Sequence, residues 1–336
     1  MTEYVLDHHN EGERARLALM SRLLDPMHRR HLEALGVGPG ARTLEVGCGN
    51  GSVSAWLAGR VRPGGHAVGV DLDLSLCDAD AAPGLEFRRG DILAAPVEPA
   101  DFDLVTARAV LHHVADPAAA VTNLVASGRG GGAFLLIEPD FLPVSIAEPP
   151  AVRAFWEGWL AWSREAGIDF FIGRKLPAML ADLELEDISA VAEIALYNGG
   201  SAWARYWTQT VGELRPRLED SGHLDRRSID TFLAHCEEPD WWTQSIAFTA
   251  VQARKPAAGL PAGVLRDTAA TPSTVGIMKK LFELLVCFLH PIAVVLMWID
   301  LATRPEMGRG TKIVWAIFGI VPLVPFLYVL TGGDLW

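Results

Sequence analysis

Residues 43–58 read Thr-Leu-Glu-Val-Gly-Cys-Gly-Asn-Gly-Ser-Val-Ser-Ala-Trp-Leu-Ala. The stretch begins as a short apolar strand, passes through glycines at alternate positions (Gly47, Gly49 and Gly51), and continues with helical spacing. Glycine has no Cβ, so a strand-to-helix turn of this kind lets the backbone approach a bound ligand closely. Dinucleotide dehydrogenases use the spacing G-x-G-x-x-G, but Ser52 stands here where their last glycine would fall. A tight turn that binds no ligand is the alternative.

An acid, Glu45, precedes the first glycine by two residues and completes the pattern E-x-G-x-G-x-G after a strand. This pattern resembles motif I of the class I S-adenosylmethionine-dependent methyltransferases. The resemblance extends over residues 4–254 and is most specific in residues 43–113. It implies that S-adenosylmethionine is the cofactor and that motif I contacts it through Glu45, Gly47, Cys48, Gly49 and Gly51.

The second apolar run, residues 67–70, ends on Asp71, 20 residues beyond Gly51. An acid at the end of the second strand can accept hydrogen bonds from both hydroxyls of a ribose. Asp73 is the nearby alternative, but Asp71 ends the run directly and is preferred, with Leu72 beside it in the cofactor site.

A third strand is expected at residues 85–92, where Gly90-Asp91 forms a turn. Taken alone, this pair is an ordinary turn. The resemblance implies that Asp91 holds the adenine amino group of the cofactor and that the backbone N–H of Ile92 meets the ring.

The segment after the fourth strand, residues 106–117, reads Thr-Ala-Arg-Ala-Val-Leu-His-His-Val-Ala-Asp-Pro. It resembles the segment that lines the cleft beside the methyl donor in small-molecule members of the family, which places Ala107 and Arg108 at the cofactor. Imidazole titrates near neutral pH, so His112 and His113 are the candidate bases, with His113 preferred. The alternatives are that the histidines only shape the wall and that Arg108 is a structural cap.

Helices alternate with apolar runs of four to six residues, which predicts an α/β fold with a doubly wound, mostly parallel sheet. The resemblance implies seven strands in a Rossmann-like arrangement, with ligands beyond the carboxyl ends of the strands. Before the first strand, helical spacing is expected in two segments, residues 11–24 and 26–35. The sixth strand is expected at residues 187–197 and the last at residues 241–253.

A helical cap insertion is expected at about residues 144–185, between the fifth and sixth strands, where the family resemblance places a cover over the substrate. Its first helix is dense in tryptophan, with Trp156, Trp159 and Trp162. An aromatic helix suits an apolar substrate pocket. The alternative, that these tryptophans belong to the core, stays open.

The tail is read as a separate unit, so the methyltransferase domain is assigned to residues 1–254, a linker to 255–277 and a membrane hairpin to 278–336. Two uncharged runs support the hairpin, 16 residues at 284–299 and 21 residues at 313–333. Because a bilayer needs about 20 apolar residues in a helix, the predicted spans are about 281–300 and 313–332. The alternatives are a re-entrant hairpin and a soluble helical hairpin packed in an oligomer.

The second run resembles the two-helix segment at the start of phospholipase D-type cardiolipin synthases. The matching residues are Lys312, Trp315, Pro322, Tyr328 and Gly332. No phosphodiesterase motif follows them, so the resemblance supports only a membrane segment.

Composition narrows the class of partner. The 336 residues carry a formal net charge of −12, which argues against a general nucleic-acid binder, because phosphate contacts need clustered Lys and Arg. The four cysteines are far apart in the sequence and form no C-x-x-C pair, which predicts reduced thiols, no disulfide and no zinc site. The polar first residues do not read as a signal peptide, so the large domain is expected in the cytoplasm.

Together these features predict an enzyme that transfers a methyl group from S-adenosylmethionine to a small, lipophilic organic acceptor. The expected partners are that acceptor and membrane lipid, with no nucleic acid and an open oligomeric state. A non-catalytic scaffold that binds the cofactor at the membrane is the first alternative. A nicotinamide oxidoreductase is the second, and the glycine spacing disfavours it.

Overall fold

The computed structural model describes residues 11–78 and 80–257. The chain divides into two units, residues 1–259 and 260–336, and all the described residues belong to the first. The predicted membrane hairpin and most of the predicted linker lie outside the described residues. Within the described residues, no helix has the length and apolarity needed to cross a membrane.

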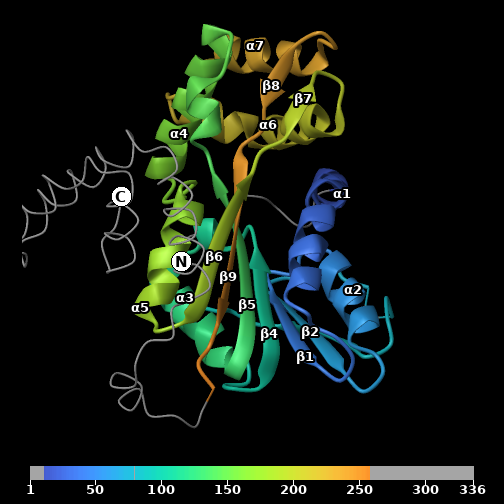
Figure 1. The fold of residues 1–336 in the computed structure, drawn as a ribbon. Coiled ribbons are helices and arrows are strands. Elements are labelled where there is room, and N and C mark those ends of the chain that lie inside the picture. The colour runs from blue at the N-terminus through green and yellow to red at the C-terminus, as the bar shows by residue number, and fades with distance from the viewer. Residues whose placement is uncertain (1–10, 79, 258–336) are drawn as a thin grey trace, which may run out of the picture. The chain divides into compact units, whose positions relative to one another are not determined.

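A seven-stranded sheet forms the centre of the described unit, in the order β3-β2-β1-β4-β5-β9-β6 (Figure 1). Strands β1 to β5 pair in parallel, whereas β9 is antiparallel to both β5 and β6. The predicted α/β fold with a doubly wound, mostly parallel seven-stranded sheet is therefore confirmed. The strands are β1 (Arg42–Val46), β2 (His66–Asp71), β3 (Leu85–Arg89), β4 (Phe102–Arg108), β5 (Gly128–Asp140), β6 (Glu186–Glu193) and β9 (Ala247–Arg254).

Successive side chains of a strand point to opposite faces, so each strand contributes to two separate cores. Leu104 of β4 packs in the core beneath α1 and α2, and its neighbour Val105 packs in the core beneath α3 and α5. Figure 1 shows these two helix pairs on opposite sides of the sheet. The helices are α1 (Glu11–Ala34), α2 (Ser52–Arg60), α3 (Pro117–Ser127) and α5 (Leu176–Asp182).

The cap is larger than the predicted insertion at residues 144–185. It contains one element from that insertion, α4, and it also contains residues 196–244, which lie in the chain between β6 and β9 (Figure 1). The helix α5 lies on the sheet, where Leu176 and Leu180 join one of its cores. The remaining elements of the cap are α6 (Ala202–Asp220), α7 (Arg226–Glu237) and the small antiparallel sheet of β7 (Leu196–Asn198) and β8 (Trp242–Gln244), beside α4 (Pro150–Glu165).

Three boundaries differ from the sequence-based expectation. The two helical segments expected on either side of Pro26 are one helix, α1. Proline removes one helical hydrogen bond at a cost of about 3 kcal/mol, but Leu24, Met27 and Leu32 bury the helix on both sides of the ring. The strands β7 and β8 pair with each other in a small separate sheet. The expected sixth strand, 187–197, therefore ends earlier, and the expected last strand, 241–253, divides into β8 and β9.

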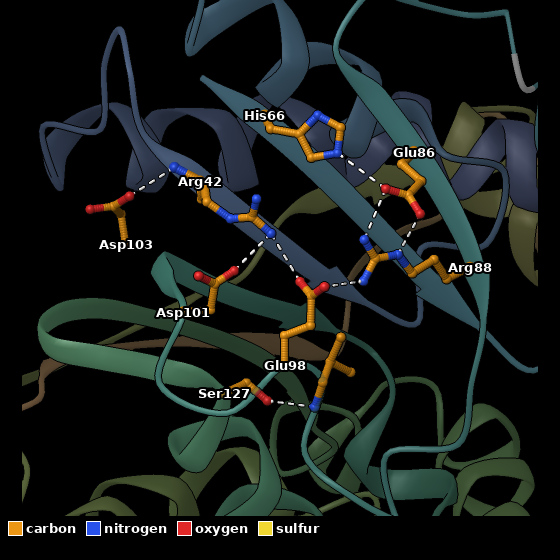
Figure 2. A network of polar contacts seen from close by, with 9 residues as sticks. Arg42, His66, Glu86, Arg88, Glu98, Asp101, Asp103 and Ser127 are labelled. Carbon is orange, nitrogen blue, oxygen red and sulfur yellow. Dashed lines mark hydrogen bonds and ion pairs between the residues drawn. The ribbon is translucent and has the colours of Figure 1, made fainter. Parts of the chain in front are cut away.

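Charged side chains form a network at the end of the sheet where β1, β2 and β3 begin (Figure 2). Arg42 contacts Glu98 at 2.9 Å, and Arg88 contacts Glu98 at 2.9 Å and Glu86 at 2.5 Å. The hydrogen bond from Arg88 lowers the pKa of Glu86 to about 2. Exposed ion pairs of this kind each contribute little to stability. The network joins β1 and β3 to the loop that contains Glu98, at the end of the sheet opposite the motif I turn.

Candidate functional site

The turn between β1 and α2 has a left-handed backbone at its three glycines, with φ of +68° at Gly47, +56° at Gly49 and +74° at Gly51. A Cβ on Gly47 would lie 2.1 Å from Val110 Cγ2, and one on Gly51 would lie 2.4 Å from Phe87 Cζ. Packing as well as backbone conformation therefore requires these two glycines. Within the part of the chain that the structure describes, the nearest atom to a Cβ on Gly49 would be Leu17 Cδ2 at 4.0 Å, so the described residues leave room for a ligand to reach this backbone.

Asp71 lies at the carboxyl end of β2, beside this turn. Its Oδ2 accepts a hydrogen bond of 2.8 Å from the backbone N–H of Gly49, and its Oδ1 accepts one of 3.4 Å from the backbone N–H of Asp73. The carboxylate of Asp73 accepts instead from Ser75 N within its own loop, at 2.8 Å. The structure thus brings Asp71, the preferred acid, to the glycine turn. Next to it, the apolar side chain of Leu72 is 55% exposed.

The remaining residues predicted to bind the cofactor lie in different surroundings. Asp91 is exposed after β3, and its Oδ1 accepts from Leu93 N at 2.9 Å. Ile92 is buried in the sheet core, and its backbone carbonyl accepts from Asn123 at 2.6 Å. Ala107 is fully buried within β4. Of these three, only Asp91 presents an exposed side chain.

Two buried carboxylates lie close to the glycine turn. Glu45 of β1 accepts a hydrogen bond of 2.5 Å from Ser54 of α2, and burial raises the pKa of Glu45 to about 7. Arg108 forms an ion pair of 3.0 Å with Asp25 of α1, and both side chains are buried. Asp25 also accepts from Ser52 Oγ at 3.3 Å, which joins α1 to the start of α2. Sequence reasoning missed Asp25, because nothing local marks it as the partner of Arg108.

Glu138 on β5 organises the segment after β4. Its fully buried carboxylate accepts from the backbone N–H groups of Val110 and Leu111, at 2.8 Å each, and of His112, at 3.3 Å. It also lies 2.8 Å from Nδ1 of His112. A carboxylate oxygen accepts hydrogen bonds, so Nδ1 of His112 is the donor in this contact and Nε2 is the ring nitrogen left for another group. Sequence reasoning missed Glu138, although an acid inside an apolar strand is a usable signal.

His113, the preferred base, has a different environment. Its ring centroid lies 3.8 Å from that of His112, and both rings line the same cavity. Burial lowers the pKa of His113 well below its ordinary value of 6.5, and the charges of His112 and Arg16 act in the same direction. The carboxylate that can orient a base therefore contacts His112, and His113 stays neutral.

An aromatic cavity of about 70 Å³ lies between these histidines and the cap. It is smaller than the roughly 150 Å³ cavity known to hold benzene, so a ring-sized ligand requires cap side chains to move apart. The tryptophans of α4 combine the two roles left open by the sequence, since all three are in the core and Trp159 and Trp162 also line the cavity. The aromatic lining of the cavity comprises Phe141, Trp159, Trp162, Phe170, Tyr206, Trp207 and Phe248.

Two cysteines that are far apart in the sequence lie close together in space. Cys48 in the glycine turn lies 3.9 Å, sulfur to sulfur, from Cys77, which also donates to the carbonyl of Gly49 at 3.2 Å. Both are free thiols, as is Cys236. The hydrogen bond with Cys77 and burial raise the pKa of Cys48, so this thiol stays protonated. Cys287 lies outside the described residues.

These features lie on the chain segments that meet at the carboxyl ends of β1, β2 and β4. The glycine turn and Asp71 form a site that suits a nucleoside. The hydroxyls of such a ligand can contact Asp71, and another part of it can lie against the backbone of the turn. The His112–Glu138 pair can take a proton from a group held in the aromatic cavity. The arrangement can therefore bind two molecules, one polar and one apolar, and move a proton at the second.

Comparison with known proteins gives a consistent result. A family model described as a methyltransferase domain matches residues 44–136. A ubiquinone biosynthesis O-methyltransferase of Xanthomonas campestris pv. campestris is 30% identical over 178 residues, which cover 50% of this chain and 73% of that protein. An uncharacterized 37.1 kDa protein in transposon TN4556 of Streptomyces fradiae is 34% identical over 123 residues, 35% of this chain and 36% of that protein.

Among solved structures, the YcgJ protein of Bacillus subtilis is 18% identical. The match covers 67% of this chain and 96% of that chain, with a TM-score of 0.48.

The raised pKa of Glu45 predicts a pH dependence of stability. Between pH 4.5 and 7 the folded state holds the Glu45 proton more tightly than the unfolded state does, so stability falls as pH rises through this window. The side chain in Glu45→Gln cannot ionise. The unfolding free energy of this variant should therefore fall less than that of the parent between about pH 5 and 8, with a difference of about 3 kcal/mol. Urea denaturation of parent and variant at both pH values measures this difference.

The matched control is Glu157→Gln, because Glu157 is an exposed carboxyl of α4. It should keep the pH dependence of the parent. If Glu45→Gln and Glu157→Gln both lose stability with pH as the parent does, Glu45 is ionised in the folded protein across the whole range.

Proposed function

Because the chain belongs to the S-adenosylmethionine-dependent methyltransferases, we propose that it methylates a small, lipophilic organic acceptor bound beneath the cap. The observation that carries this proposal is the contact of 2.8 Å between His112 and Glu138 at the wall of an aromatic cavity. The relative from Xanthomonas is named for methylation at oxygen in ubiquinone biosynthesis, which supports a lipophilic acceptor with a hydroxyl group.

The residues of the glycine turn fit the cofactor. Among the described residues, no atom would lie closer than 4.0 Å to a Cβ on Gly49, which suits close approach of a ligand to the backbone. Asp71 already accepts from Gly49 N, and its carboxylate has lone pairs left for ribose hydroxyls. S-adenosylmethionine supplies a methyl group already activated by a positively charged sulfur. The protein therefore needs mainly to hold and align the two reactants and to exclude water from them.

His112 is the proposed general base for a hydroxyl acceptor. Glu138 fixes the ring with Nδ1 protonated, so Nε2 is the atom that can take the proton. The carboxylate also stabilises the imidazolium that forms, as the acid of a triad does for its histidine. The surrounding aromatic side chains keep water from the acceptor while its oxygen attacks the methyl carbon.

Removing the negative charge of Asp71 should weaken cofactor binding. Asp71→Asn keeps an oxygen for Gly49 N but loses charge-assisted hydrogen bonds to ribose, which are worth about 1.5–3 kcal/mol. We expect the affinity for S-adenosylhomocysteine, measured by titration calorimetry, to fall by roughly ten- to a hundredfold. Asp73→Asn is the control and should change it by no more than about twofold. If the two changes lowered the affinity equally, Asp71 would have no specific role in binding the cofactor.

Loss of the proposed base should reduce transfer without reducing donor binding. His112→Asn should lower the rate of radiolabel transfer from S-adenosylmethionine to a lipid extract by about 10²–10⁴-fold. Glu138→Gln should lower it less.

Binding of S-adenosylhomocysteine by both variants provides the control for folding. A parental rate in His112→Asn would show that the acceptor needs no base from this residue. Saturable donor binding by the parent, with no transfer to any extract, would favour the non-catalytic scaffold.

We further propose that the enzyme works at the cytoplasmic face of a membrane, held there by residues 278–336 as a two-helix, multi-pass hairpin. Two uncharged runs of 16 and 21 residues support this proposal, since about 20 apolar residues in a helix cross a bilayer. We expect the full chain in the salt-washed membrane pellet and a chain of residues 1–257 in the supernatant. Recovery of both in the same fraction would contradict a tail anchor.

A further inference from the structure

Most polar groups that line the aromatic cavity have partners within the protein. The guanidinium of Arg16 donates to both oxygens of Glu13, at 2.6 and 2.7 Å. The hydroxyl of Tyr206 contacts the sulfur of Met20 at 4.0 Å, and that of Thr210 donates to the carbonyl of Tyr206 at 2.8 Å. His112, as described above, donates to Glu138. These groups have hydrogen-bond partners without a ligand.

Two indole groups of the same cavity differ from the rest. Trp159 of α4 and Trp207 of α6 are each 2% exposed, and their Nε1 atoms are buried with no hydrogen-bond partner among the residues that the structure describes. The two rings lie edge to face, with centroids 5.9 Å apart and an angle of 87° between their planes. The indole N–H is a donor only, and buried tryptophans usually find it a partner. Leaving such a donor unpaired costs free energy, so each one needs an explanation.

We propose that Trp159 and Trp207 are specificity-determining residues, whose N–H groups donate to oxygen atoms on a flat aromatic acceptor. This inference rests on the proposed function, because it assigns the aromatic cavity to the methyl acceptor. Each indole N–H is a donor and needs a hydrogen-bond acceptor, and an oxygen is the simplest acceptor that a mostly apolar ligand can carry.

The shape of the cavity supports a ring rather than an aliphatic chain. Phe141 and Phe170 stack with ring centroids 4.1 Å apart, and Trp159 lies 6.2 Å from Phe170. Flat faces of this kind favour offset-stacked and edge-to-face partners. The acceptor class is therefore a lipophilic aromatic ring that bears ether, carbonyl or hydroxyl oxygens. A hydrocarbon of the same shape would fill the cavity and leave both N–H groups unpaired.

Two probes of matched shape test this class without any methyl transfer. In para-dimethoxybenzene two ether oxygens replace two methylene groups of para-diethylbenzene, and neither molecule has a hydroxyl to methylate. Titrations use the full chain saturated with S-adenosylhomocysteine. We expect the dimethoxy probe to bind about tenfold more tightly, although the diethyl probe is more apolar. In proton–nitrogen NMR spectra, the indole N–H proton signals of Trp159 and Trp207 should lie further downfield with the dimethoxy probe than with the diethyl probe, because a hydrogen bond deshields the proton whereas both probes exert the ring current of a benzene ring.

Three variants identify the donors. Trp159→Phe and Trp207→Phe should each reduce the preference for the dimethoxy probe by roughly threefold and leave binding of the diethyl probe within about twofold. Trp162→Phe is the matched control, because Trp162 lines the same cavity but its Nε1 is not among the buried unpaired atoms; it should keep the preference.

The inference would be overturned if the parent bound both probes equally or bound neither. It would also be overturned if its two indole signals lay at the same position in the two complexes. A preference that persists in both variants would do the same. The NMR result on the parent stands even if a variant does not fold. Binding of S-adenosylhomocysteine is measured separately, so failure of the proposed function is seen as loss of that binding and is distinguishable from failure of the aromatic assignment.

Discussion

The carboxylate of Glu138 is fully buried, and it accepts hydrogen bonds from three consecutive backbone N–H groups and from the ring of His112. A buried charge is tolerated only where such partners compensate for lost water, so the carboxylate and the segment after β4 hold each other in place. Val110, in that segment, also approaches the position where Gly47 would carry a side chain. One interaction thus connects the base, the wall of the aromatic cavity and the glycine turn.

Polar and apolar functions are separated within the described unit. Beneath the glycine turn, Glu45, Asp25 and Arg108 form a buried set of charges, in which burial favours the protonated form of Glu45. On the side of the cap, aromatic rings from α4 and α6 meet the histidines in a mostly aromatic cavity. This separation suits a reaction between a charged nucleotide-like donor and an apolar acceptor, because each binds in surroundings that match its own polarity.

The cap combines two parts of the chain that are separate in the sequence. Trp156 and Trp159 of α4 pack against Trp207 of α6, with Trp156 and Trp207 centroids 4.8 Å apart. The same rings therefore serve as core and as cavity wall. Since the cavity is smaller than a ring-sized ligand needs, access depends on movement of these side chains, and the packing of the cap controls both stability and entry.

The sequence by itself determined the alternating strands and helices, the glycine turn and the acid that ends β2. These features depend on residues a few positions apart, and glycine spacing and apolar periodicity report them directly. Only the tertiary structure decided that Glu138 selects His112, that Asp25 pairs with Arg108, and that Cys48 meets Cys77. It also decided that α1 continues through Pro26 and that residues 196–244 join the cap. Each depends on contacts between distant segments, which local periodicity does not encode.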